Sequence, residues 1–159
     1  DTFNMHGQNE VEFLIRTNLG DDLHPLSKIA SGGEISRVML AIKTVLVMGD
    51  TISTVIFDEI DTGISGIAAQ KVAEKLAMIA KDRQVLCITH LPQIAAMGDT
   101  HYLIEKCVDG ERTTTHLEEL TEEKIHEELC RLMGGIVTQN TLQSAAEIKT
   151  LANHYKQTC

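Results

Sequence analysis

Two short apolar runs separated by an amphipathic segment constrain the fold of this chain more than any other feature. The runs are residues 53–57 and 84–89, and each has the length and composition of a buried strand. Between them, apolar residues recur at helical spacing over residues 68–80. A strand, a helix and a second strand in this order form a βαβ unit, with parallel strands and a right-handed crossover. The sequence therefore predicts an α/β fold with a parallel core.

Elements are also predicted before this unit. Residues 10–17 have the composition of a strand, and a turn-rich segment follows them. A helix is expected from Ser31 to about Met48, where Gly49 and Asp50 would end it. Because this helix is apolar on nearly all sides, we expect it to be buried.

After the βαβ unit, the sequence predicts a short helix and a β-hairpin. Pro92 suits the first position of a short helix that Gly98 would close. Strands at 101–107 and 111–117 flank Val108-Asp109-Gly110, and an Asp-Gly pair is a strong indicator of a hairpin turn.

Two further helices complete the predicted order of elements. They are expected at residues 122–133, before a pair of glycines, and at 141–155. With 159 residues the chain is long enough for one domain with a real core and too short for two of ordinary size. Residues from 10 onward are therefore expected to form one compact unit.

Composition excludes several classes of function. The 14 basic residues are outnumbered by 23 acidic ones, which argues against a stand-alone nucleic-acid clamp. The longest apolar stretch, 38–48, contains Lys43 and is too short to span a bilayer, so no membrane partner is expected. The four cysteines are widely spaced, which favours free thiols and a cytoplasmic location over a zinc site or disulfide framework.

The first candidate site is Ser31-Gly32-Gly33-Glu34, at the start of the long helix. One interpretation is a capping box, in which the Ser31 hydroxyl accepts from the Glu34 N–H and Glu34 reaches back. That interpretation leaves the glycines unexplained, since each costs about 1 kcal/mol in a helix relative to Ala. The other interpretation is an anion site, where the missing Cβ atoms let a phosphate approach the exposed N–H groups.

The second and third candidate sites follow the two apolar strands. Asp58 and Glu59 end the first strand, where they either form an acidic strand-to-loop boundary or hold Mg²⁺ and deprotonate a water. His90 ends the second strand, as a structural residue or as a partner of a γ-phosphate or the attacking water. Parallel neighbouring strands would bring all three residues to one edge of the sheet, where ligands bind in open α/β folds.

Taken together, these features resemble the ATP-binding-cassette (ABC) superfamily. Residues 31–37 (S-G-G-E-I-S-R) resemble its signature motif, residues 54–59 its Walker B strand, and residues 88–90 its switch-histidine loop. More narrowly, the runs L-S-K-I-A-S-G-G-E-I-S-R, F-D-E-I-D-T-G-I-S-G and I-T-H-L-P-Q-I-A-A are similar to the RecN family of bacterial DNA repair ATPases. That family is related to the structural-maintenance-of-chromosomes (SMC) proteins.

The resemblance implies ATP and Mg²⁺ as ligands and assigns roles to the motif residues. Ser31, Gly32 and Gly33 would bind the γ-phosphate of ATP held by a second, opposing head, with Glu34 and Arg37 bracing their loop. Asp58 would serve Mg²⁺, Glu59 would be the general base, and His90 would sense the γ-phosphate. Residues 61–66 would form the D-loop, although Gly63-Ile64-Ser65 replaces its usual ending and Ser65 would cap the next helix.

The resemblance also implies that this chain is the C-terminal half of an ABC/SMC-type ATPase head. No G-x-x-x-x-G-K-[ST] loop and no heptad repeat occurs in the 159 residues, so the Walker A lobe and the coiled-coil arm are expected elsewhere. Its expected partners are that N-terminal lobe, a second head of a homodimer, and DNA ends, with the nucleoid as location. Two hypotheses stand: an ATPase lobe in DNA double-strand break repair and recombination, and a non-catalytic head that serves dimerisation.

Overall fold

The βαβ unit is the centre of the molecule. The computed structural model describes residues 5, 7–9, 11–16, 19–28, 31–46, 51–110 and 112–158. Strand β3 (Thr54–Phe57) and strand β4 (Gln84–Cys87) pair in parallel, with Thr54 opposite Gln84 and Phe57 opposite Cys87. Helix α2 (Gly66–Ala80) connects them. The predicted α/β class and the parallel core are therefore confirmed.

Helix α2 is buried along one whole face and organises the core. It contacts α1 (Gly32–Leu46), α3 (Pro92–Met97), α5 (Gln139–Thr158) and β4. Helix α4 (Glu122–Gly134) packs on α3 and α5, and Gly135 ends it in the left-handed region, at φ 89°. The core is one cluster of buried apolar side chains, made of Leu40, Phe57, Ile60, Val72, Ala73, Leu76, Ala77, Ile79, Ile94, Ala96, Met97, Ile125, Leu129, Cys130, Ala145 and Ala152.

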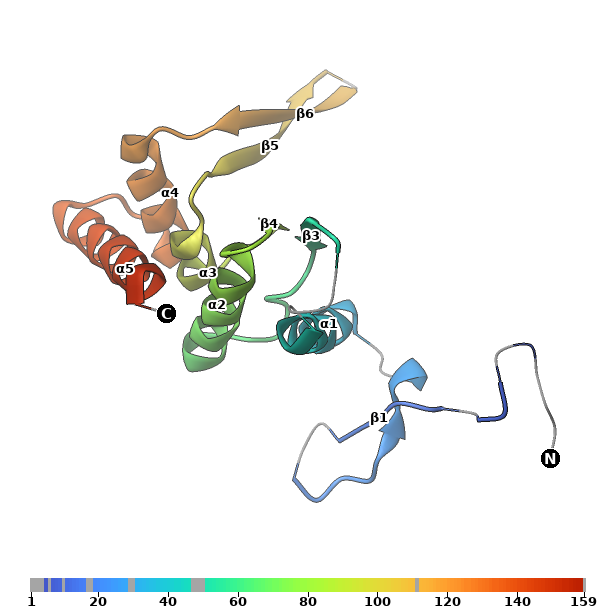
Figure 1. Cartoon of the computed structure of the whole chain (residues 1–159). Coiled ribbons are helices and arrows are strands. Elements are labelled where there is room, and N and C mark those ends of the chain that lie inside the picture. Colours follow the sequence, from blue (N-terminus) through green and yellow to red (C-terminus); the bar gives the residue numbers. More distant parts are fainter. Residues whose placement is uncertain are drawn as a thin grey trace.

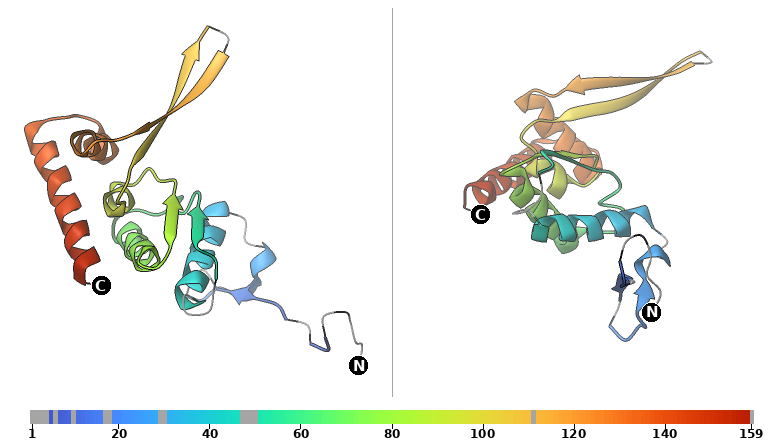
Figure 2. Two further views of the ribbon diagram at one scale, coloured as in Figure 1. Left: turned by 45° about the horizontal axis from the view of Figure 1, so that its top comes forward. Right: turned by 45° about the vertical axis from the view of Figure 1, so that its right-hand side comes forward.

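A long hairpin projects from this core. Strand β5 (Tyr102–Asp109) and strand β6 (Arg112–Glu119) pair antiparallel, and Figure 2 shows the hairpin standing clear of the helices. The predicted hairpin is confirmed, but β5 continues through Asp109, so that the turn lies between Asp109 and Arg112 rather than at 108–110. Asp109 keeps its place in the ladder because it pairs directly with Arg112.

The N-terminal part lies away from the core, so the expectation of one compact unit from residue 10 is wrong. Only Leu14–Ile15 (β1) and His24–Pro25 (β2) form strands there, followed by a 3₁₀ turn, η1 (Leu26–Lys28). Residues 10 and 17, the ends of the predicted strand, lie outside the described residues. Figure 1 shows this hairpin beyond α1, and Leu14 in β1 and the neighbouring Phe13 and Leu23 are exposed.

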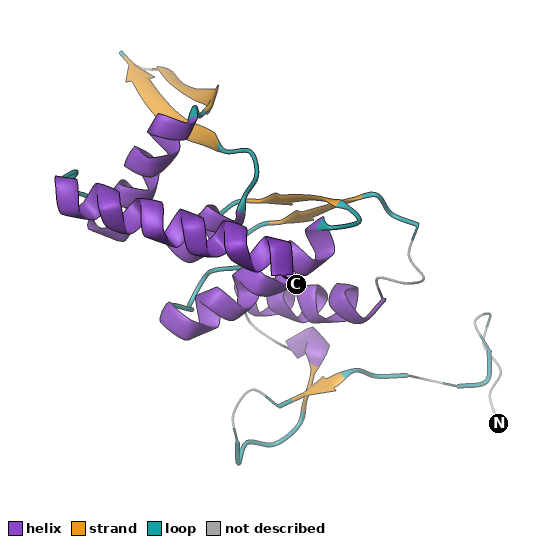
Figure 3. Ribbon diagram, turned by 60° about the vertical axis from the view of Figure 1, so that its left-hand side comes forward, coloured by secondary structure: helices purple, strands orange, loops and turns teal. Residues whose placement is uncertain are grey.

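Helix α1 is not buried as expected. Among its described residues, only Gly33 and Leu40 are fully buried, whereas Ile35, Met39 and Val45 are exposed. The helix packs on α2 along one side, and among the described residues the sheet that it flanks consists of β3 and β4 (Figure 3). The described part of the chain thus covers only one face of helix α1, although the helix is apolar on nearly all sides. The predicted end of this helix, at Met48 to Asp50, lies outside the described residues.

Within the described ranges, no helix has both the length and the hydropathy that crossing a bilayer requires.

Candidate functional site

The first turn of α1 is capped as one of the two interpretations predicts. The Ser31 hydroxyl accepts a hydrogen bond from the Glu34 N–H at 3.3 Å. Among the hydrogen bonds of the described residues, the reciprocal bond, in which the Ser31 N–H would donate to the Glu34 carboxylate, does not occur. The cap therefore satisfies one of the free N–H groups of this helix end.

The two glycines of this turn pack directly against the loop that follows β3. A Cβ atom on Gly32 would lie 2.7 Å from Oε2 of Glu59. A Cβ atom on Gly33 would lie 2.7 Å from the carbonyl oxygen of Glu59 and 2.9 Å from Cβ of Thr62. At Gly33 the neighbouring atoms belong to the backbone and to a Cβ atom, so this close approach explains that glycine, whereas at Gly32 only the flexible end of the Glu59 side chain would have to move.

Two side chains of α1 extend the same contact. The Ser36 hydroxyl donates to the Asp58 carbonyl at 2.9 Å. The Arg37 guanidinium donates to the carbonyl of Ile60 at 3.2 Å and to that of Thr62 at 2.7 Å. The resemblance implied that Arg37 braces the signature turn, whereas in the structure it braces residues 58–62, which we call the acidic loop.

Glu59 has an unusual backbone in this loop. Its φ is 55°, the one positive value among the described residues other than glycine. A residue with a Cβ atom avoids this region because the atom crowds its own backbone. The carboxylates of Asp58 and Glu59 are both exposed, while the next residue, Ile60, is fully buried and anchors the loop in the core.

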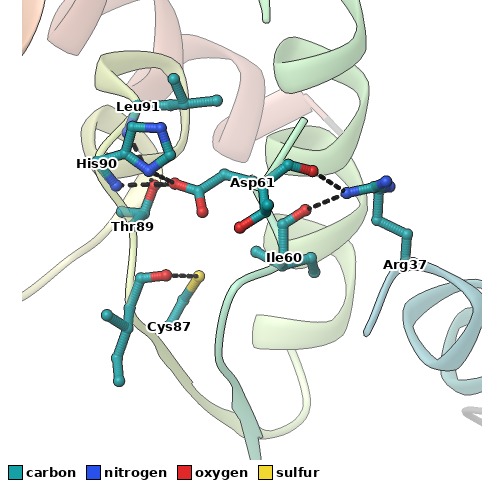
Figure 4. A network of polar contacts seen from close by, with 9 residues as sticks. Arg37, Ile60, Asp61, Cys87, Thr89, His90 and Leu91 are labelled. Atoms are coloured by element: carbon teal, nitrogen blue, oxygen red, sulfur yellow. Dashed lines mark hydrogen bonds and ion pairs between the residues drawn. The ribbon is translucent and has the colours of Figure 1, made fainter. Parts of the chain in front are cut away.

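Asp61 is the one charged side chain that is buried among the described residues, with 3% of its surface exposed. Its Oδ2 atom accepts from the Thr89 hydroxyl and from the His90 N–H, each at 2.7 Å, and lies 3.0 Å from Nδ1 of His90. Figure 4 shows these contacts on one side of the loop and those of Arg37 on the other. Burial raises the pKa of Asp61, but the bonds from Thr89 and His90 outweigh it and hold the pKa below its ordinary value.

The predicted site residues are thus drawn together through a residue that the sequence analysis did not single out. The resemblance places Asp61 only at the start of the D-loop and implies no role for it. A usable indication was present, because Thr89-His90 ends the strand beside β3 and both groups can donate to a carboxylate. Ser65 does occupy the N-cap position of α2, but its hydroxyl makes no capping hydrogen bond.

Cys87 lies beside this site but carries no nucleophilic chemistry. Burial, with the nearby carboxylates of Asp61 and Asp58, raises the pKa of its thiol to about 12. The thiolate is the reactive form of cysteine, so the protonated thiol behaves here as a packing group.

Asp58 fits a magnesium ion that is held mainly by other ligands. Among the described residues, no group of three or more acidic, histidine or cysteine side chains is arranged to hold a metal. Mg²⁺ is usually bound by one or two carboxylates together with waters and substrate phosphates. One exposed carboxylate at the end of β3 is compatible with that mode and not with a cage made of protein ligands alone.

Comparisons with known proteins decide the family. The chain is 48% identical over 153 residues to the DNA repair protein RecN of Bacillus subtilis, and 48% identical over 155 residues to that of Halalkalibacterium halodurans. These alignments include 96% and 97% of this chain. The chain belongs to the RecN family. RecN of Deinococcus radiodurans is a further relative, at 46% identity over 143 residues.

The RecN relatives are much longer than this chain. The chain spans about a quarter of their length, 27% of the B. subtilis protein and 25% of the D. radiodurans protein, and it matches their C-terminal part. No family model matches the chain.

A solved structure has a fold similar to that of this chain. It comes from work on the "ATP-driven dimerization and DNA stimulated activation of SMC ATPases". The TM-score is 0.52 at 22% sequence identity, and the match covers 74% of this chain and 70% of the other. The predicted fold, half of an SMC-type ATPase head, agrees with this likeness.

Proposed function

We propose that this chain is the C-terminal lobe of a RecN-type ATPase head that acts in the repair of DNA double-strand breaks and in recombination. The observation that carries the proposal is the junction between α1 and the acidic loop. There, the glycines of the signature turn touch Glu59, and Asp61 ties the same loop to His90. The motif residues therefore form one connected structure instead of separate structural features.

At the start of α1, the exposed end of the signature turn is suited to a phosphate. Gly32 is exposed, and the N–H groups of a first helical turn point out of the helix and favour an anion. In the proposed site, Ser31, Gly32 and Gly33 contact the γ-phosphate of ATP bound to a second head, and Glu34 supports their turn. Each head would then complete the ATP site of the other.

At the other side of the junction, the acidic loop supplies the groups for hydrolysis. Glu59 is the proposed general base, which takes the proton of the attacking water. Asp58 would hold Mg²⁺, whose charge offsets that of the phosphates when it is bound. His90 contacts the γ-phosphate through the side of its ring that faces away from Asp61.

Three partners follow from this proposal. The first is the N-terminal lobe of the same head, which would supply the Walker A loop, and the second is the opposing head of a homodimer. The third is DNA at broken ends, supported by the names of the RecN relatives. The proposal places the protein in the cytoplasm, with the nucleoid. Because each site needs groups from another lobe, we expect this chain alone to bind Mg-ATP weakly and not to hydrolyse it.

The test is steady-state ATP hydrolysis by the complete head, in which this chain is joined to its N-terminal lobe. Wild type and Glu59→Gln are compared over a range of protein concentrations. Turnover that rises faster than linearly with concentration, and that the variant loses while it still binds ATP, supports a two-head ATPase. A folded, ATP-binding wild type without turnover, with or without DNA, would favour a non-catalytic dimerisation module.

A further inference from the structure

Two hydrogen-bond donors and one ring nitrogen converge on a single oxygen atom of Asp61. The Thr89 hydroxyl and the His90 N–H donate hydrogen bonds to Oδ2, and Nδ1 of the His90 ring lies 3.0 Å from the same atom. The Thr89 hydroxyl also accepts from the Leu91 N–H at 3.1 Å, which fixes its rotation. A carboxylate oxygen in this environment holds both the backbone and the side chain of His90.

The contact at Nδ1 determines what the histidine can present to a ligand. The two ring nitrogens lie on opposite sides of an imidazole, so Nε2 faces away from Asp61. The side chain of His90 is 68% exposed, against 3% for that of Asp61. With a proton on Nδ1, the neutral ring offers Nε2 as an acceptor for water, and the charged ring offers it as a donor for a phosphate oxygen.

Asp61 belongs to the acidic loop, which also contains Glu59. Asp61 follows Glu59 by two residues, and Arg37 holds the carbonyls on both sides of it, at Ile60 and Thr62. A displacement of this loop therefore moves the carboxylate of Glu59 and the anchor of His90 together.

We propose that Asp61 is a positioning residue that holds His90 with Nε2 toward the γ-phosphate and keeps it in register with Glu59. This inference rests on the proposed function, because it assigns His90 to the γ-phosphate. Asp61 is neither a second base nor a magnesium ligand, since it is buried and its Oδ2 is occupied by protein donors. It acts on the reaction through His90.

The kinetic test uses the complete protein with Asp61→Asn, His90→Ala and the double variant. Asn retains the shape and an acceptor oxygen but removes the charge, so we expect kcat to fall about 10–100-fold, as for other residues that orient a functional group. The KM for ATP should change little, because the lost contact is not with the bound nucleotide. Asp99→Asn, an exposed aspartate paired with Lys156, is the matched control and should retain wild-type turnover.

The double variant separates positioning from a general structural role. If Asp61 acts through His90, adding Asp61→Asn to His90→Ala should lower kcat by less than about twofold further. If the two losses multiply, Asp61 supports the protein independently of His90 and the inference is overturned. Thermal unfolding of each variant identifies any loss that comes from unfolding.

A second measurement does not depend on ATP hydrolysis. The ring ¹⁵N resonances of His90 in the 159-residue chain, at a pH where the ring is neutral, report which nitrogen carries the proton. We expect the Nδ1–H form in wild type and a shift toward Nε2–H in Asp61→Ala. A wild-type ring protonated at Nε2 overturns the inference, even if the complete head is an active ATPase. An inactive head in which His90 has the Nδ1–H form overturns the proposed function but still supports the contact between Asp61 and the His90 ring.

Discussion

The glycines that begin α1 differ in what a methyl group would touch. At Gly33 it would meet the carbonyl oxygen of Glu59 and Cβ of Thr62, which cannot move without the backbone. At Gly32 it would meet only the end of the Glu59 side chain, which can rotate. We expect Gly33→Ala to lower the free energy of unfolding by about 1–3 kcal/mol, and Gly32→Ala to change it by less than about 1 kcal/mol. Chemical denaturation of the chain measures both, and equal losses would contradict the contact at Gly33.

Glu59 illustrates a conflict between stability and chemistry at a single residue. Its φ of 55° is unfavourable for any side chain with a Cβ atom, and only glycine adopts it at no steric cost. We therefore expect Glu59→Gly to be more stable than Glu59→Gln by about 1 kcal/mol. Both variants lack the proposed base, so the comparison isolates the backbone. If denaturation shows Glu59→Gln to be the more stable variant, the left-handed backbone at this position is wrong.

At the scale of elements, the sequence predicts well what periodicity and chain order determine. The βαβ unit, the short helix at Pro92 and the hairpin all follow from local pattern and turn residues. The burial of α1 could not be predicted, because hydropathy shows that a helix is apolar but not which elements cover it. The contacts of Asp61 could not be predicted for a similar reason, because its partners Thr89 and His90 follow another strand.

The docking of α5 on α3 depends on a lysine with a lowered pKa. Lys149 donates to the carbonyls of Ala96, at 3.1 Å, and Gly98, at 2.6 Å, near the end of α3. Burial, with a contribution from the nearby charge of Lys156, lowers the pKa of Lys149 from 10.5 to about 8. Between these pH values the unfolded chain binds more protons at this site than the folded chain. The contribution of Lys149 to stability therefore rises as the pH increases over this range.

Replacing this lysine should remove that pH dependence. We expect the free energy of unfolding of wild type, relative to Lys149→Met, to increase from pH 8 to pH 10.5. The increase should be on the order of 1 kcal/mol, after allowance for the part of the side chain that water screens. Urea denaturation at several pH values measures it, with Lys75→Met on α2 as the control. A difference that decreases with pH would contradict the buried amine.

At the scale of the whole molecule, the described residues cover the parallel sheet on one side only. Val55, Val85 and Cys87 pack against the core, whereas Ile56, Leu86 and Ile88 are 67%, 45% and 52% exposed. Ile56 and Leu86 are opposite each other in the register, and side chains opposite each other lie on the same face of a sheet. We call this apolar face the open face. A sheet that is covered by another lobe in the complete protein would have such an exposed apolar face when that lobe is absent.

The open face yields opposite expectations for the chain alone and for the complete head. In the chain alone, Ile56→Thr with Ile88→Thr should reduce self-association and change the melting temperature by less than about 3 °C, because both side chains are already in water. In the complete head, where the N-terminal lobe is proposed to cover this face, the same pair should lower the free energy of unfolding by about 2–4 kcal/mol.

Analytical ultracentrifugation and denaturation measure the two effects. Ile104→Thr with Val108→Thr, exposed on β5, is the matched control and should be neutral in both proteins. If the open-face pair is equally mild in the complete head, the N-terminal lobe does not cover β3 and β4.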